Sequence, residues 1–134
     1  MKKITLLLSF SIMFVSPLFS QNNSNKIISS GKIIYDKHCL SCHQANGSGV
    51  PNMNPPLSNV SWVTGSKEIL IKLVLNGVST PMEIDGELYH NPMPSHQHLS
   101  DQEIADVLTY IRTNFGNKAI GISKEEVTKV RSNQ

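Results

Sequence analysis

The clearest pattern of apolar and polar positions lies near the C-terminal end, between Ser100 and Gly116. Ser100 and Glu103 have the spacing of a capping box, and Asp101 adds negative charge where the helix dipole favours it. The apolar residues in this interval recur at helical spacing: Ile104, Val107, Leu108, Ile111 and Phe115. The pattern predicts a helix with one buried stripe that ends at Gly116.

Shorter helical patterns precede and follow this segment. Ser29 or Ser30 can cap a helix that runs towards Cys39, and Ser66 can cap another that ends before Gly77. The second of these has an apolar face: Ile69, Leu70, Leu73 and Val74. Residues 123–131 fit one or two final helical turns. The chain is therefore predicted to be mostly α-helical.

The remaining segments are punctuated by glycine and proline. Residues 44–65 contain three of each type and show neither helical nor alternating periodicity, which predicts a long loop. Asp85-Gly86 is the strongest local turn signal and predicts a small hairpin. Long loops in small domains usually wrap something. Aromatic residues make up only 6% of the chain, so we expect a bound group to complete the core.

The first twenty residues have the character of a secretory signal peptide. Two lysines precede an apolar run from Ile4 to Val15, and small and polar residues follow it. The run is shorter than the roughly 20 apolar residues that span a bilayer, which argues against the alternative of an uncleaved anchor. We expect cleavage after Ser20 and a periplasmic mature protein.

Removal of residues 1–20 changes the charge of the protein. Twelve basic residues less Lys2 and Lys3 leave ten, which balance ten acidic residues. A neutral chain is a poor candidate for nucleic-acid binding, which depends on neutralising phosphates. We expect a flexible leader over residues 21–30 and one domain over residues 31–131, since this length suffices for a single core.

The chemistry of the chain is concentrated in the segment C-L-S-C-H, at Cys39, Cys42 and His43. A thiol–disulfide catalyst is disfavoured because no βαβ pattern surrounds it. A structural zinc site needs four protein ligands, and the chain has no second cysteine pair. A disulfide would close so short a loop that it would barely constrain the unfolded chain.

Haem attachment accounts for every position of this segment. Each cysteine can add to one vinyl group, and His43 is placed to bind the iron from one face. Export of the chain and a glycine- and proline-rich wrapping loop agree with this interpretation. A covalently held haem c would also supply the missing part of the core.

Several further stretches resemble a known family. They are G-K-I-I-Y-D-K-H-C-L-S-C-H, G-S-G-V-P, P-P-L, D-G-E-L-Y-H-N-P-M-P and L-S-D-Q-E-I-A-D-V-L-T-Y-I-R-T-N-F-G-N. Over residues 31–131 the chain resembles a small bacterial class I cytochrome c with one haem. The resemblance implies the cytochrome c fold, in which several helices wrap around one covalently bound haem c. It also implies single-electron transfer between redox partner proteins, with no small-molecule substrate and no enzymatic activity.

The resemblance further implies the ligands of the iron. His43 is the expected proximal ligand, with its outer ring nitrogen bonded to the carbonyl of Pro55. Met93 lies where the family places its axial methionine, and Pro92 and Pro94 restrict its backbone. Met82 is the alternative methionine.

Other residues near these ligands have less defined roles. Met53 and Met82 are expected to fill core space. A histidine is the alternative sixth ligand. The candidates for it, otherwise expected to be exposed, are His90, His96 and His98. Trp62 has two interpretations, as an N–H donor to a haem propionate or as a half-buried core ring.

The same resemblance implies that the first and last helices of the domain cross closely. Gly31 and Tyr35 on the first helix, and Val107 and Tyr110 on the last, are the expected packing residues. Two alternatives to a free carrier remain open. The chain can be the haem subunit through which electrons enter a larger oxidoreductase, or a haem enzyme or sensor with an open iron site.

Overall fold

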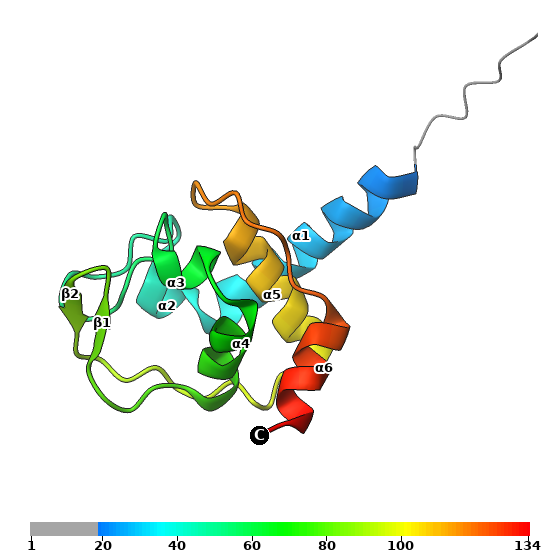
Figure 1. The fold of residues 1–134 in the computed structure, drawn as a ribbon. Coiled ribbons are helices and arrows are strands. Elements are labelled where there is room, and N and C mark those ends of the chain that lie inside the picture. Colours follow the sequence, from blue (N-terminus) through cyan, green and yellow to red (C-terminus); the bar gives the residue numbers. More distant parts are fainter. Residues whose placement is uncertain (1–18) are drawn as a thin grey trace, which may run out of the picture.

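The computed structural model describes residues 19–134, with side chains described from Ser24 onward. Residues 1–18, most of the predicted signal peptide, lie outside the described part. Six helices and one hairpin follow in the order shown in Figure 1. Their bounds are α1 Phe19–His38, α2 Leu40–His43, α3 Ser61–Thr64, α4 Lys67–Asn76, β1 Met82–Ile84, β2 Glu87–Tyr89, α5 Asp101–Thr113 and α6 Lys124–Ser132. None of the described helices is both long and apolar enough to cross a membrane.

Helices α1 and α5 pack closely, as the sequence predicted. A Cβ atom at Gly31 would lie 2.2 Å from the backbone oxygen of Asp106 and 2.7 Å from the Cβ of Tyr110. Tyr35 packs against Tyr110 with ring centroids 5.6 Å apart, and both residues are buried. Only glycine at residue 31 allows the two backbones to approach this far.

Helix α1 is longer than the sequence pattern suggested. Residues 21–30, expected to form a loose leader, continue the helix N-terminally to Phe19, and this part extends beyond the rest of the molecule in Figure 1. No glycine or proline interrupts the chain between Ser20 and Gly31. Because the C-terminal half of α1 is nucleated by packing on α5, each further residue adds one hydrogen bond without a new nucleation cost.

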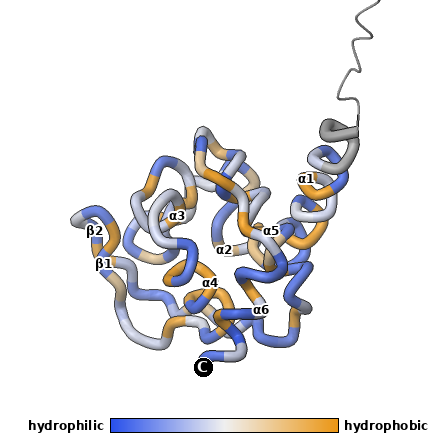
Figure 2. The backbone as a smooth tube through the Cα atoms, turned by 45° about the vertical axis from the view of Figure 1, so that its right-hand side comes forward, coloured by the Kyte–Doolittle hydropathy of each residue, from blue (hydrophilic) through white to orange (hydrophobic). Residues whose placement is uncertain are grey.

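Helix α4 begins at its predicted cap but buries a different face. The Ser66 side chain accepts a hydrogen bond from the Ile69 N–H. Ile69 is nevertheless 51% exposed. The buried residues of α4 are Leu70, Ile71, Val74 and Leu75. Ile71 and Leu75 extend the stripe to the other side because α6 covers α4 there, a contact that the local pattern could not reveal. Figure 2 shows α4 as a hydrophobic stretch in the middle of the molecule.

Helix α5 confirms its predicted cap, and α6 begins at a cap that the sequence analysis did not single out. Ser100 and Glu103 form the capping box of α5, and Ser123 and Glu126 form a second one at α6. Helix α5 ends at Thr113, so Phe115 lies outside its buried stripe, contrary to the prediction. Its φ is +55°, and its ring packs on Tyr35 with centroids 5.1 Å apart. The interval between Thr113 and Gly116 is a turn whose aromatic residue returns to the core.

The hairpin and the long loop complete the fold. Strands β1 and β2 pair antiparallel around Asp85 and Gly86, which both have positive φ, as a type I′ turn requires. Residues 44–65 form the predicted loop with one difference, the short helix α3. The buried Asn117 side chain donates to the Leu57 carbonyl and accepts from the Asn59 N–H. This asparagine joins the loop to the end of α5.

Candidate functional site

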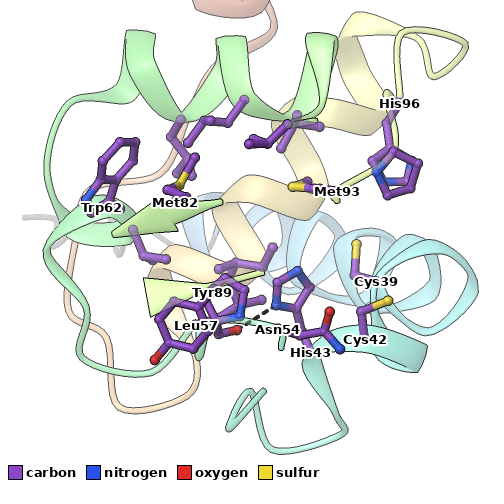
Figure 3. Close-up of a pocket in the computed structure, with 18 of the residues that line it drawn as sticks. Cys39, Cys42, His43, Asn54, Leu57, Trp62, Met82, Tyr89, Met93 and His96 are labelled. Atoms are coloured by element: carbon purple, nitrogen blue, oxygen red, sulfur yellow. Dashed lines mark hydrogen bonds between the residues drawn. The ribbon is translucent and has the colours of Figure 1, made fainter. Parts of the chain in front are cut away.

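A mostly apolar pocket lies at the centre of these elements (Figure 3). Its walls come from α2, the long loop, α4, the hairpin, α5 and the segment between the hairpin and α5. All four residues predicted to hold the haem line it: Cys39, Cys42, His43 and Met93. Residues up to 54 positions apart in the chain thus meet around one cavity.

His43 occupies a buried position at the end of α2. Its Nδ1 lies 2.9 Å from the carbonyl oxygen of Pro55, and since a carbonyl can only accept, Nδ1 carries the proton. This is the partner that the sequence predicted. Burial lowers the pKa of His43, and the hydrogen bond to Pro55 opposes this shift. The ring is therefore neutral, and its Nε2 keeps the lone pair that a metal ligand needs.

Cys39 and Cys42 flank the same wall as free thiols. Both are partly buried, and burial raises the pKa of Cys39 to about 11, with a further contribution from Cys42. A thiolate is the form that binds zinc and attacks disulfides, so this environment disfavours both chemistries. A neutral thioether carries no charge and fits the apolar wall.

Met93 lies across the pocket from His43 in Figure 3, with its sulfur directed inward. Its backbone is fixed by two hydrogen bonds to Val78, from Val78 N–H to Met93 O at 2.8 Å and from Met93 N–H to Val78 O at 2.9 Å. Met82 also lines the pocket and packs against the core, as expected of a space-filling residue. Met53 does not line this pocket and is 48% exposed, so the expectation that it fills the core was wrong.

The histidines of the loop before α5 have different environments. His90 and His98 are exposed, as expected. His96 is only 8% exposed and lines the pocket, so the expectation that it is exposed was wrong. Its backbone N–H donates to the Val74 carbonyl at 2.9 Å, which draws this residue inward against α4.

The pocket also contains residues that the sequence did not single out. Tyr89 is buried in its lining, and Asn54 contributes beside Pro55. The alternation of the hairpin was the available signal for Tyr89, but three-residue strands are too short to define an inward face. Trp62 lines the pocket at the end away from Cys39 in Figure 3, which is consistent with both of its predicted roles.

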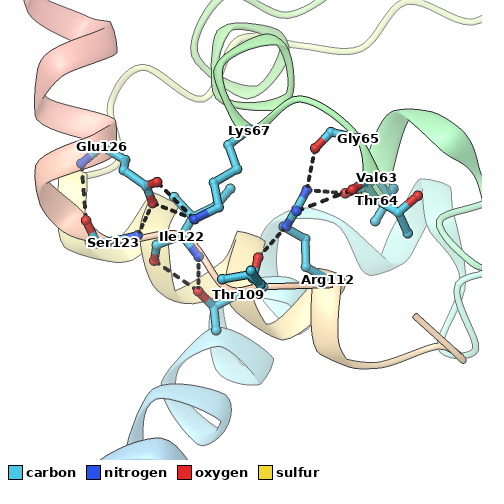
Figure 4. A network of polar contacts seen from close by, with 10 residues as sticks. Val63, Thr64, Gly65, Lys67, Thr109, Arg112, Ile122, Ser123 and Glu126 are labelled. Atoms are coloured by element: carbon cyan, nitrogen blue, oxygen red, sulfur yellow. Dashed lines mark hydrogen bonds and ion pairs between the residues drawn. The ribbon is translucent and has the colours of Figure 1, made fainter. Parts of the chain in front are cut away.

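Neither arginine of the chain lines the pocket. The guanidinium of Arg112 donates to the carbonyls of Val63, Gly65 and Ile120, as Figure 4 shows in part. Arg131 pairs with Asp101 at 2.7 Å. Both cations hold backbone and carboxylate groups together elsewhere in the fold.

Comparison with known proteins agrees with this arrangement. The sequence model of the cytochrome c family matches residues 28–115. Cytochrome c-552 of Thermus thermophilus is 38% identical over 103 residues, which cover 70% of this chain and 79% of that protein. The chain belongs to the cytochrome c family, in the class of small proteins with one haem c.

Other relatives are parts of larger enzymes. The cytochrome c subunit of a quinone-dependent alcohol dehydrogenase from Gluconacetobacter polyoxogenes is 38% identical over 104 residues. The fructose dehydrogenase cytochrome subunit of Gluconobacter japonicus is 30% identical over 106 residues. In both cases the match covers about three quarters of this chain but only 22% of the relative.

The pocket fits the cofactor of this family. Two thiols and an imidazole lie on one wall, a thioether lies on the opposite wall, and the remaining lining is mostly apolar. Covalent attachment needs the thiols, and a low-spin iron with two axial ligands needs a donor on each side. The chain therefore carries haem c and transfers electrons.

Proposed function

We propose that this chain is a periplasmic carrier of single electrons that performs no chemistry on a substrate. In this proposal Cys39 and Cys42 form the thioether bonds to the haem, while His43 and Met93 bind its iron. The observation that carries the proposal is the position of the Met93 thioether across the pocket from the imidazole of His43. With both His43 and Met93 holding the iron, oxygen and peroxide would find no open site on it.

Backbone groups and the apolar walls of the pocket set the behaviour of this centre. The Pro55 carbonyl holds the His43 ring in one orientation and makes it a better donor. The paired hydrogen bonds between Val78 and Met93 fix the backbone of the second ligand. When bound, the haem supplies a reversible ferrous–ferric couple, and a methionine ligand raises its potential. The apolar walls exclude water, so little solvent has to reorganise when the charge changes.

Ligand binding to the iron tests this proposal. The wild-type protein should reduce and oxidise rapidly with small dyes, bind carbon monoxide weakly and turn over peroxide negligibly. Met93→Ala should lose the weak red-region charge-transfer band of a thioether–ferric centre, and should gain carbon monoxide binding and some peroxidase activity. Met82→Ala is the matched control, since this methionine lines the same pocket. If Met82→Ala opens the iron and Met93→Ala does not, the assignment of the ligand is wrong.

Strong peroxide turnover by the wild-type protein would instead favour an open-site haem enzyme. Such an enzyme usually needs an acid–base group or a cation above the iron. Both arginines of the chain are engaged away from the pocket, so neither supplies such a cation.

A second candidate function is that of a haem subunit within a larger oxidoreductase. The relatives that are dehydrogenase cytochrome subunits favour it. Crosslinking in the periplasm, followed by copurification with a chain carrying an affinity tag, distinguishes the two. A stoichiometric complex with a dehydrogenase supports the subunit, and a monomeric peak with only transient crosslinks supports the free carrier. Recovery of the mature chain with the cytoplasmic fraction would contradict the proposed location.

A further inference from the structure

Three histidines to which the proposed function gives no role lie together at one end of the haem pocket. They are His38, His96 and His98, called the histidine cluster below. One ring nitrogen from each lies within 4.8 Å of one from the other two. The ring centroids are 5.5–5.9 Å apart. His38 is the last residue of α1, while the other two belong to the loop before α5.

Two observations indicate that this cluster is more than a chance approach of side chains. His96 is more than nine-tenths buried, yet its Nδ1 has no hydrogen-bond partner among the described residues. A buried nitrogen without a partner destabilises the fold unless something binds it. His98 is exposed, so an ion can reach the cluster from solvent.

The backbone that carries the histidine cluster is held from two sides. The Ser95 hydroxyl donates to the Leu75 carbonyl, beside the bond from His96 to Val74. From the other side, the guanidinium of Arg131 donates to the carbonyls of Gln97 and Leu99 at 2.9 Å and 2.7 Å. A loop fixed on both sides of two histidines gives up little freedom when an ion binds.

We propose that the histidine cluster binds a divalent transition metal ion such as Zn²⁺, with water in the remaining position. Imidazole nitrogens suit zinc, copper and nickel. In a tetrahedral site with bonds of about 2.0–2.1 Å, ligand nitrogens lie roughly 3.3 Å apart. Rotation of the exposed His98 ring, with small movements of the His38 and His96 rings, brings the ligand nitrogens to this distance. Burial, and after it the neighbouring histidines, lower the pKa of His96, which favours the neutral form that a metal requires.

The position of the cluster gives the ion a consequence for the haem. His38 precedes Cys39, and both His38 and His96 line the haem pocket. A divalent cation beside that edge favours the less positive ferrous state over the ferric state. Binding of the ion at this end of the pocket, where Cys39 and Cys42 lie, should therefore raise the midpoint potential of the haem.

Zinc titration of the mature protein with its haem attached tests the site. Competition against a chromogenic chelator should give one Zn²⁺ per chain. His98→Gln should weaken this binding by at least about tenfold, since even outer-shell changes cost roughly 10–100-fold. His90→Gln is the matched control, an exposed histidine on the same segment but outside the cluster. This variant should bind zinc as the wild type does. The haem absorbance of both variants should equal that of the wild type.

The potential supplies an independent readout. Saturating Zn²⁺ should raise the midpoint potential of the wild type and of His90→Gln, and should leave that of His98→Gln unchanged. Absence of stoichiometric binding, or equal affinities for wild type and His98→Gln, would overturn the proposal. The haem spectrum and the carrier test with Met93→Ala do not depend on this result, so the two proposals fail separately.

Discussion

The two walls of the haem pocket are built in different ways. In the attachment wall, residues 38–57, both cysteines and His43 lie within one short segment of the sequence. The methionine wall, residues 77–99, is a hairpin between irregular segments, and Met93 reaches the pocket only because that segment is held by Val78. On the first wall the spacing of the sequence sets the geometry, and on the second wall hydrogen bonds to distant residues set it.

This difference predicts how each wall fails. Damage to the attachment wall removes the cofactor, and with it the centre of the core. Damage to the methionine wall should leave the haem attached but change its axial ligand, its potential or its access to small molecules. The walls touch through backbone bonds from His90 to Asn52 and from Asn91 to Met53, both 3.1 Å long.

The largest effect is expected from the double variant Cys39→Ser/Cys42→Ser. Without thioether bonds no haem should remain after denaturation, and the pocket loses its main apolar filling. Intact mass and haem staining of periplasmic protein measure the first effect, and circular dichroism measures the second. Ser41→Ala, between the two cysteines and exposed, is the control that should keep its haem. Covalent haem in the double variant would refute the assignment of the attachment residues.

Gly31→Ala should weaken the packing of α1 on α5, which supports the attachment wall. Its Cβ would collide with the Asp106 backbone oxygen and the Tyr110 Cβ. Overpacking of this kind costs about 1–3 kcal/mol, and we expect about 2 kcal/mol because alanine regains part of the loss through its helix propensity. Denaturant unfolding gives the change, while the thioether–iron band should be retained. A loss of that band would show that the effect is not confined to packing.

Gly77→Ala is the corresponding change on the methionine wall. Gly77 has φ of +71°, and a Cβ there would lie 2.4 Å from the Met93 carbonyl oxygen. Its ψ of −171° places Gly77 in a region open essentially to glycine alone, and the backbone strain there costs about 1–3 kcal/mol. We expect a weakened thioether–iron band with the haem still attached, whereas Gly31→Ala should keep this band. Identical spectra and stabilities for the two alanine variants would remove the distinction between the walls.

The smallest effect is expected from Asp101→Asn. Hydrogen bonds from Thr128 and then Arg131 lower the pKa of Asp101, and the same Arg131 holds the loop before α5. Because the folded pKa lies below the unfolded value of about 3.9, the charge stabilises the protein above that pH. This contribution is lost as pH falls through the folded pKa.

For a pair of this exposure we expect a loss of about 0.5–1 kcal/mol at pH 7. The difference between variant and wild type should disappear in acid, and urea unfolding across pH measures it. Asp36→Asn, in the more exposed pair with Lys32, is the control and should lose less. A difference that persists unchanged at pH 2 would contradict an electrostatic origin.

Features carried by adjacent residues were predictable from the sequence. Ser66, Ser100 and the Asp85-Gly86 turn act through bonds within a few residues, and the structure confirms each of them. The segment C-L-S-C-H, together with the glycine- and proline-rich loop and the lack of other cysteines, likewise predicted haem, and the family comparison agrees.

What only the tertiary structure decided depends on contacts between distant segments. Ile69 was assigned to a buried face because periodicity cannot say which side α6 covers. His96 was expected at the surface because nothing local shows that Val74 draws it inward. The sequence by itself determined the cofactor and the helix caps and predicted the attachment residues, because these follow from residue type and spacing. The inward faces, the meeting of His38 with His96 and His98, and the placement of Met93 opposite His43 were decided by folding, because they require backbone groups far apart in the chain to bond.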